Sequence, residues 1–130
     1  MNWHFQDGAP IYTQLIGQIR QGIVSGAFQP GERLPSVRDL AMAAGVNPNT
    51  MQRALAELER DGLVFSQRTA GRFVTEDKTM IDAAKLGLAE NHIKTFLLAM
   101  TRLGYQREEI LDLLRQETSK EGITNGGSGM

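Results

Sequence analysis

Apolar positions in the first quarter of the chain recur every four residues. Between Pro10 and Gly26 this repeat predicts one amphipathic helix, because four-residue steps stay on one helical face and because proline and glycine are typical of helix ends. The repeat comprises Ile11, Leu15, Ile19 and Ile23, flanked by Tyr12, Ile16 and Val24. Ahead of the helix, Trp3 and Phe5 belong to an aromatic patch that is expected to cover it.

Two shorter helices joined by a tight turn are predicted next. Ser36 is expected to cap the first helix, and Gly45 to end it in a left-handed conformation. Asn47 is expected to cap the second helix, whose first position is Pro48. The inward positions of the second helix are Met51, Ala54, Leu55 and Leu58. Four polar residues remain outside near its N-terminal end: Asn49, Thr50, Gln52 and Arg53.

The segment after this helix predicts a β-hairpin, with strands at 63–67 and 72–75 and a tip at 68–71. Three helices followed by a hairpin are the order of a winged helix-turn-helix domain. In that geometry the second helix of the turn enters the major groove of DNA, where Asn and Gln suit adenine and Arg suits guanine or phosphate. The alternative interpretation is that the four polar residues are only the solvated face of an amphipathic helix.

The C-terminal part predicts two more helices, the first ending near Leu103-Gly104 and the second over 106–117. They have too few residues to enclose a core unaided, so we expect them to pack against a second copy of the chain. The alternative is that they pack back on the winged helix of the same chain. The predicted dimerisation residues are Leu88, Ile93, Phe96, Leu97, Met100, Ile110, Leu111 and Leu114.

The predicted fold is mainly α with a small β-hairpin. A winged helix-turn-helix domain at 1–77 is followed by a short two-helix dimerisation segment at 78–121 and by a flexible tail at 122–130. A length of 130 residues, 41% of them hydrophobic, fits one compact domain with such an appendage. Met42, Met80 and Met100 are interpreted as core filler.

Several functions are excluded by composition. The chain has no cysteine, hence neither disulfides nor thiolate metal sites, and its two histidines, His4 and His92, are far apart. There is no Gly-rich phosphate loop either, so neither an enzyme nor a cofactor is predicted. The N-terminus lacks the regions of a signal peptide, and no apolar run approaches the ~20 residues of a membrane span. We therefore expect a soluble, cytoplasmic protein without membrane contact.

The net charge of −1 is unusual for a DNA-binding protein. Up to Glu76 all cations are arginines, and their seven charges are balanced by seven acidic residues. However, five of these arginines lie in or beside the turn, the second helix and the hairpin, namely Arg33, Arg38, Arg53, Arg68 and Arg72. Because arginine binds phosphate bidentately, a basic edge on a neutral body is expected to contact the DNA backbone.

Three stretches carry a family resemblance: Pro10 to Leu15, Pro30 to Ala41 and Val46 to Leu55, continued by Leu58-Glu59 and Gly62. Together they resemble the N-terminal domain of GntR-family bacterial transcription regulators, over about residues 10 to 76. The sequence 47–50, with a C-terminal part of only about 50 residues, resembles the YtrA subfamily in particular.

The resemblance implies a homodimeric transcription regulator, most often a repressor, that binds an inverted-repeat operator in double-stranded DNA. Arg38 matches a position that contacts DNA in the family, and Gly71 matches the second glycine of the wing. The sequence departs from the family at Pro48, Thr69 and Arg72. From the residues and the resemblance together, the predicted DNA-binding set is Arg33, Ser36, Arg38, Asn47, Asn49, Thr50, Gln52, Arg53, Arg68, Gly71 and Arg72.

Two functional alternatives stay open at this point. A winged helix can also serve as a protein-interaction module without specific DNA binding, although the polar recognition helix argues against it. A small-molecule effector, whose identity the residues do not reveal, would have to sit between subunits because the C-terminal part is short.

Overall fold

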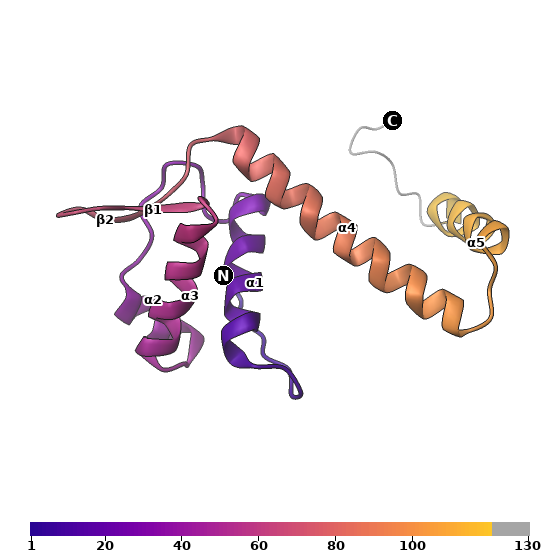
Figure 1. Cartoon of the computed structure of the whole chain (residues 1–130), viewed down its shortest axis with the longest axis horizontal. Coiled ribbons are helices and arrows are strands. Elements are labelled where there is room, and N and C mark those ends of the chain that lie inside the picture. The colour runs from indigo at the N-terminus through magenta and orange to yellow at the C-terminus, as the bar shows by residue number, and fades with distance from the viewer. Residues whose placement is uncertain (121–130) are drawn as a thin grey trace. The chain divides into compact units, whose positions relative to one another are not determined.

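The computed structural model describes residues 1–120, which form five α-helices and one β-hairpin. The elements are α1 (Ile11–Ser25), α2 (Val37–Ala44), α3 (Pro48–Arg60), β1 (Val64–Gln67), β2 (Gly71–Val74), α4 (Lys78–Arg102) and α5 (Arg107–Lys120). The predicted architecture, a winged helix-turn-helix followed by two helices, is confirmed (Figure 1). The predicted tail over 122–130, and the last residue of the predicted dimerisation segment, lie outside the described residues.

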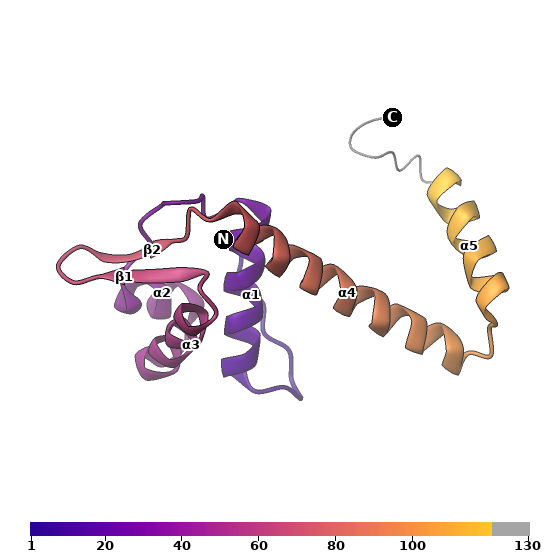
Figure 2. The ribbon, with the colours of Figure 1, turned by 45° about the horizontal axis from the view of Figure 1, so that its top comes forward.

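The hydrophobic core lies where α1, α2 and α3 meet the hairpin (Figure 2). Helix α1 packs most extensively on α3, and the predicted inward stripes of both helices are buried, although Ile11 at the start of α1 is exposed. Large side chains that are almost completely buried are Leu15, Ile19, Ile23, Met51, Leu55, Leu58, Leu63, Val64 and Val74. Each contributes about 1.5 to 3 kcal/mol of transfer free energy, so this cluster is the main source of stability for the domain.

The first residues of the chain are fixed to α1 by two of its glutamines. Gln18 accepts a hydrogen bond from the His4 backbone N–H (3.0 Å) and donates one to the His4 carbonyl (2.5 Å). Gln14 forms the same two bonds with the backbone of Gln6, at 2.8 and 2.9 Å. The residues between these anchor points, Trp3 and Phe5, pack against the core. The predicted aromatic cover of α1 is therefore confirmed.

The hairpin is antiparallel, with Val64 opposite Val74 and Gln67 opposite Gly71. A third segment extends it, because Arg33 pairs with Phe73 in an isolated bridge. The Leu34 N–H donates to the carbonyl of residue 72 at 2.8 Å, and the Val74 N–H donates to that of residue 32 at 2.9 Å. The loop that leads into α2 is thus joined to the wing through its backbone.

The contacts divide the chain within α4, into one unit of Met1–Ala89 and another from Glu90 onward. This division lies later than the predicted boundary at residue 77, because Ile81 and Ala84 pack with the core of the first unit. Within the described part of the chain, none of the helices combines the length and apolar character that crossing a membrane requires.

The interpretation of the methionines as core filler is wrong for Met42 and Met80. Met42 is 71% exposed, because α2 turns its neighbours Leu40 and Ala41 inward, and position 42 lies about 200° around the helix from position 40. Met80, in the first turn of α4, is also exposed.

Candidate nucleic-acid interface

The two helices of the helix-turn-helix begin and end at the three residues that the sequence predicted. The Ser36 hydroxyl accepts a hydrogen bond from the Asp39 N–H at 3.0 Å, which caps α2. Gly45 ends α2 with a φ of +71°, in the left-handed region that other residues adopt only at a cost. The Asn47 side chain accepts from the Asn49 N–H at 2.7 Å and caps α3. The predicted caps are confirmed, and the start of α3 is well defined.

The outer face of α3 carries the polar residues that the sequence singled out. Asn49, Gln52 and Arg53 are exposed, and Thr50 is half-buried. The opposite face is anchored in the core by fully buried side chains, so the helix cannot rotate to hide this polar row. Asn47 differs from the others, because its side-chain oxygen already accepts the capping hydrogen bond, so a ligand would meet its amide nitrogen and the remaining lone pair of that oxygen.

Arg53 does not extend freely from α3. Its Cζ atom lies 4.5 Å from the centroid of the Tyr12 ring, which belongs to the first turn of α1. This cation–π contact holds the guanidinium beside the polar row. Sequence reasoning missed it because the two residues are far apart in the chain.

The wing is shaped by a glycine and an arginine. Gly71 begins β2 with a φ of +103°, and a Cβ atom at this position would lie 3.1 Å from Nε of Arg33. The Arg33 side chain therefore passes directly over the glycine. At the tip the Ala70 N–H donates to the carbonyl of Gln67 at 3.0 Å, which closes the turn around Arg68.

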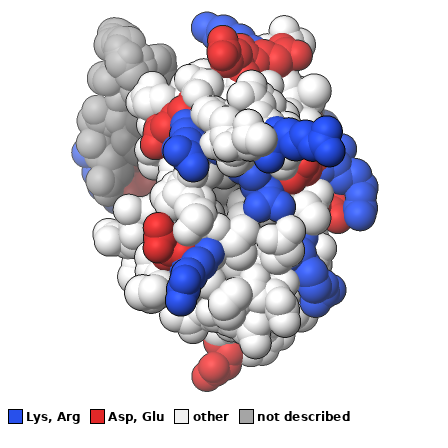
Figure 3. All heavy atoms as spheres, turned by 90° about the vertical axis from the view of Figure 1, so that its left-hand side faces the viewer, with Lys and Arg blue, Asp and Glu red and all other residues white. Residues whose placement is uncertain are grey.

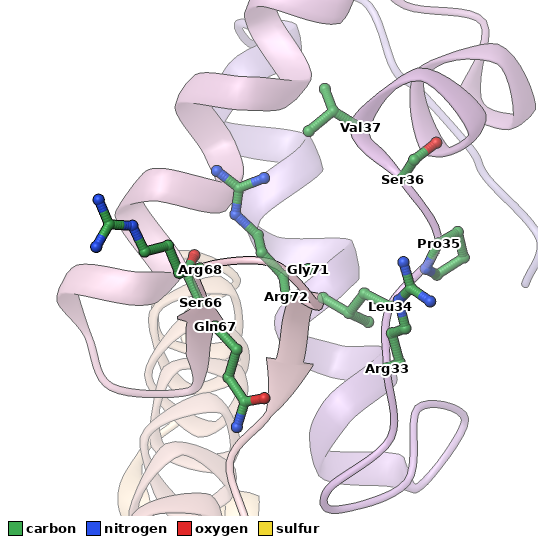
Figure 4. Close-up of a pocket in the computed structure, with 10 residues that line it drawn as sticks. All are labelled: Arg33, Leu34, Pro35, Ser36, Val37, Ser66, Gln67, Arg68, Gly71 and Arg72. Carbon is green, nitrogen blue, oxygen red and sulfur yellow. The ribbon is translucent and has the colours of Figure 1, made fainter.

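A groove of about 360 Å³ separates the wing from the start of α2 (Figure 4). Three arginines line it, and the cap residue Ser36 stands at its other wall. The lining residues are Arg33, Leu34, Pro35, Ser36, Val37, Ser66, Gln67, Arg68, Gly71 and Arg72. Guanidinium groups beside the N-terminus of a helix suit an anionic group such as phosphate.

Three of the seven arginines in the first unit are paired with acidic residues. Arg20 binds Asp61 at 2.5 Å, Arg60 binds Glu57 at 2.7 Å, and Arg72 binds Glu59 at 2.9 Å. Glu59 also accepts a hydrogen bond from Ser66 at 2.9 Å, so this pair connects the end of α3 to both strands of the wing. Arg72 was predicted to contact DNA, and its Nε atom is already used within the domain.

The other four arginines have no carboxylate within 4.0 Å among residues 1–120; they are Arg33, Arg38, Arg53 and Arg68. All four are exposed. Basic side chains lie across the side of the molecule from which the hairpin projects (Figure 3). The charge of the first unit is therefore balanced in total, but those of its arginines that lack a carboxylate partner among residues 1–120 all belong to the predicted DNA-binding set.

Most residues of the predicted dimerisation set are accessible. On α4, Ile93 is 55% exposed, and Phe96 and Leu97 are exposed as well, whereas Leu88 and Met100 are half-buried. On α5, Leu111 and Leu114 are exposed, but Ile110 is only 5% exposed. Ile110 lines an apolar groove of about 370 Å³ within the second unit, together with Leu97, Thr101, Tyr105, Arg107, Leu111 and Leu114.

Comparison with known proteins places this geometry in context. The sequence profile of "Bacterial regulatory proteins, gntR family" matches residues 11–74, from the start of α1 to the end of β2. The chain is similar to the uncharacterized HTH-type transcriptional regulator YhcF of Bacillus subtilis (strain 168), with 38% identity over 118 residues, 91% of this chain and 98% of YhcF. It is also similar to the HTH-type transcriptional repressor YtrA of the same organism, with 31% identity over 112 residues, 85% of this chain and 86% of YtrA.

Solved structures extend the comparison. A GntR family transcriptional regulator from Listeria monocytogenes has a TM-score of 0.79 and 38% identity, covering 86% of this chain and 98% of its own. A structure of AraR(DBD) in complex with operator ORX1 has a TM-score of 0.53 and 28% identity, covering 58% of this chain and 96% of its own. The similarity to YhcF and to the Listeria regulator continues beyond residues 11–74, because it covers 91% and 86% of this chain.

Proposed function

The chain belongs to the GntR family of bacterial regulatory proteins, and from this premise we propose that it is a homodimeric repressor that binds an inverted-repeat operator. That it is a DNA-binding transcription regulator follows from the family. Repression is supported by the relative YtrA, which is named a repressor. The observation that carries the proposal is the set of four arginines around the polar face of α3 and the wing that have no acidic partner among residues 1–120.

We assign α3 to the major groove of the operator, because a helix anchored on one face presents the other as a fixed row of hydrogen-bonding groups. Asn49 and Gln52 have side-chain amides that can bind adenine bidentately. Arg53 would bind guanine or an adjacent phosphate. Arg33, Arg38 and Arg68 would contact the DNA backbone, and the groove between the wing and α2 would receive a phosphate group.

Dimerisation is proposed through the second unit. Helices α4 and α5 leave large apolar side chains exposed to solvent in the single chain. Burying these side chains against another surface would lower the free energy. A second copy of the chain has the same apolar surface, so a dimer with a two-fold axis would bury the apolar surfaces of both copies against each other. Two recognition helices related by that axis would read the two halves of an inverted repeat.

The first experiment is a salt-dependent titration of the protein against genomic DNA fragments, including the region upstream of its own gene. When Arg53 as well as Arg33, Arg38 and Arg68 contacts a phosphate, a dimer makes eight such contacts, and the slope of log K against log salt should be about −7. Arg38→Ala should weaken binding uniformly across sequences and reduce the slope by about 2. Arg60→Ala is the matched control, because Arg60 is paired with Glu57, and it should change little.

Saturable binding to one fragment that contains an inverted repeat would support the proposal and identify the operator. Equally weak binding to every fragment, unchanged in Arg38→Ala, would instead favour a protein-interaction module.

Dimerisation is tested separately by light scattering or sedimentation. Leu97→Glu should convert the dimer to a monomer, because it places a charge on the predicted contact surface. Leu98→Glu is the control, since its exposed side chain lies about 140° around α4 from that of Ile93. A monomeric wild-type protein, or equal effects of both variants, would contradict this interface.

A further inference from the structure

Tyr12 is set in a rigid part of the domain. Its ring is half-buried and packs against the core. The first turn of α1 is tied down on both sides, because Gln14 Nε2 donates to the carbonyls of Gln6 and Ala9, both at 2.9 Å, and Thr13 Oγ1 donates to that of Pro10 at 3.0 Å. The ring is therefore a fixed platform beside α3.

Arg53 uses this platform in place of an acidic partner. Its guanidinium carbon lies 4.5 Å from the ring centroid, and it has no carboxylate within 4.0 Å in residues 1–120. A guanidinium over an aromatic face is attracted by the ring quadrupole, and the contact takes up none of the N–H groups. An acidic partner would instead occupy the same donors that a base or phosphate needs.

A free arginine loses much side-chain entropy when it is immobilised in a complex. An arginine already held over a ring loses less, so its contact with DNA is stronger by that difference. We infer that Tyr12 is a positioning residue that holds Arg53 in place for DNA recognition, and that it acts through Arg53 alone. This inference rests on the proposed function of Arg53.

Substitutions at Tyr12 can separate the contribution of its hydroxyl from that of its ring. The Tyr12 hydroxyl makes no hydrogen bond within residues 1–120, so neither the core nor the cation–π contact depends on it. Tyr12→Phe therefore keeps the platform, whereas Tyr12→Leu keeps apolar bulk and removes the ring. Together the two variants distinguish the contributions of the aromatic ring, the hydroxyl group and apolar packing to DNA binding.

The first measurement is NMR of the protein without DNA. The ring should shift the side-chain protons of Arg53 upfield, and this shift should persist in Tyr12→Phe and disappear in Tyr12→Leu. An Arg53 signal that is the same in all three proteins would overturn the inference before any DNA is added.

The second measurement is a double-mutant cycle of operator affinity. Tyr12→Leu should weaken operator binding about two- to fivefold, which corresponds to the free energy of an exposed cation–π contact. Tyr12→Phe should bind the operator as tightly as the wild type. In the Arg53→Ala background, Tyr12→Leu should have no further effect. Phe5→Leu is the matched control, because Phe5 also packs against the core and should leave affinity unchanged.

The outcomes separate this inference from the proposed function. If Arg53→Ala weakens binding and Tyr12→Leu does not, the inference fails and the proposed function stands. If Tyr12→Phe weakens operator binding as much as Tyr12→Leu does, and if it does so in the Arg53→Ala background as well, the hydroxyl itself contacts DNA and the inference is wrong. If the wild type binds no fragment specifically, the proposed function fails, and with it the role of Tyr12.

Discussion

Replacing Gly71 by alanine tests how the wing is built, because two effects meet at this residue. The first is backbone strain: at a φ of +103°, a residue with a Cβ atom should cost about 1 to 3 kcal/mol of folding free energy. The second is the contact of that Cβ with Arg33, whose Nε would be 3.1 Å away. An arginine side chain is flexible, so this contact should move Arg33 at little energetic cost.

The two effects should therefore appear in different assays. Thermal unfolding followed by circular dichroism should show a Tm lower by about 4 to 8 °C for each kcal/mol of strain, to the same extent in the wild-type and the Arg33→Ala backgrounds. The loss of DNA affinity should depend on the background: it should be clear in the wild type and smaller in Arg33→Ala, where no long side chain remains to be displaced.

Gly17→Ala provides the control of opposite sign. Gly17 lies within α1, and an added Cβ there meets no atom within 4 Å, so alanine should stabilise the protein by about 0.5 to 1 kcal/mol. A Gly71→Ala protein as stable as the wild type would refute the assignment of a positive φ to the wing. An equal loss of DNA affinity in both backgrounds would refute the role of the Arg33 contact.

Three further predictions concern stability. Gln18→Ala should lower the free energy of unfolding by about 1 to 2 kcal/mol and speed hydrogen exchange at the amide of His4, because both hydrogen bonds to that residue are lost. Leu58→Ala, at a fully buried position, should cost about 2 to 5 kcal/mol in chemical denaturation; a loss below about 1 kcal/mol would contradict its place in the core. Glu59→Ala should cost about 1 kcal/mol, because its arginine partner is only 20% exposed, whereas Glu57→Ala, whose partner Arg60 is 74% exposed, should cost less than about 0.5 kcal/mol.

The features that the sequence predicted best depend on residues close together in the chain. Ser36, Gly45 and Asn47 act on backbone groups two to four residues away, so their caps are readable from residue type and spacing. The buried stripe of α3 follows from helical periodicity in the same way. Local signals of this kind define where each helix begins and which face it buries, and they located the polar row that defines the candidate site.

The features that the sequence did not predict depend on how the helices cross. Tyr12 meets Arg53 only because α1 packs on α3, and Arg72 meets Glu59 only because the wing folds back on the end of that helix. Met42 was misplaced for a related reason, since an eight-residue helix has room for few inward positions and periodicity does not show which apolar residues fill them. Long-range partners of this kind decide which side chains are free to bind.

The pairing of charges also explains how a domain without net positive charge can bind DNA. Acidic residues neutralise Arg20, Arg60 and Arg72. The Arg20 pair joins α1 to the end of α3, the Arg72 pair joins the wing to α3, and the Arg60 pair lies within α3. The arginines without an acidic partner in the described part of the chain are predicted DNA-binding residues, and DNA phosphates would take the place of carboxylates beside them. Counter-ion release depends on the phosphates contacted and not on the total charge, so a net charge of −1 is no obstacle to steeply salt-dependent binding. Because the chain has no net positive charge, it attracts DNA only weakly at long range. Its affinity therefore depends more on the contacts that its interface arginines make at one particular site than on general attraction to DNA.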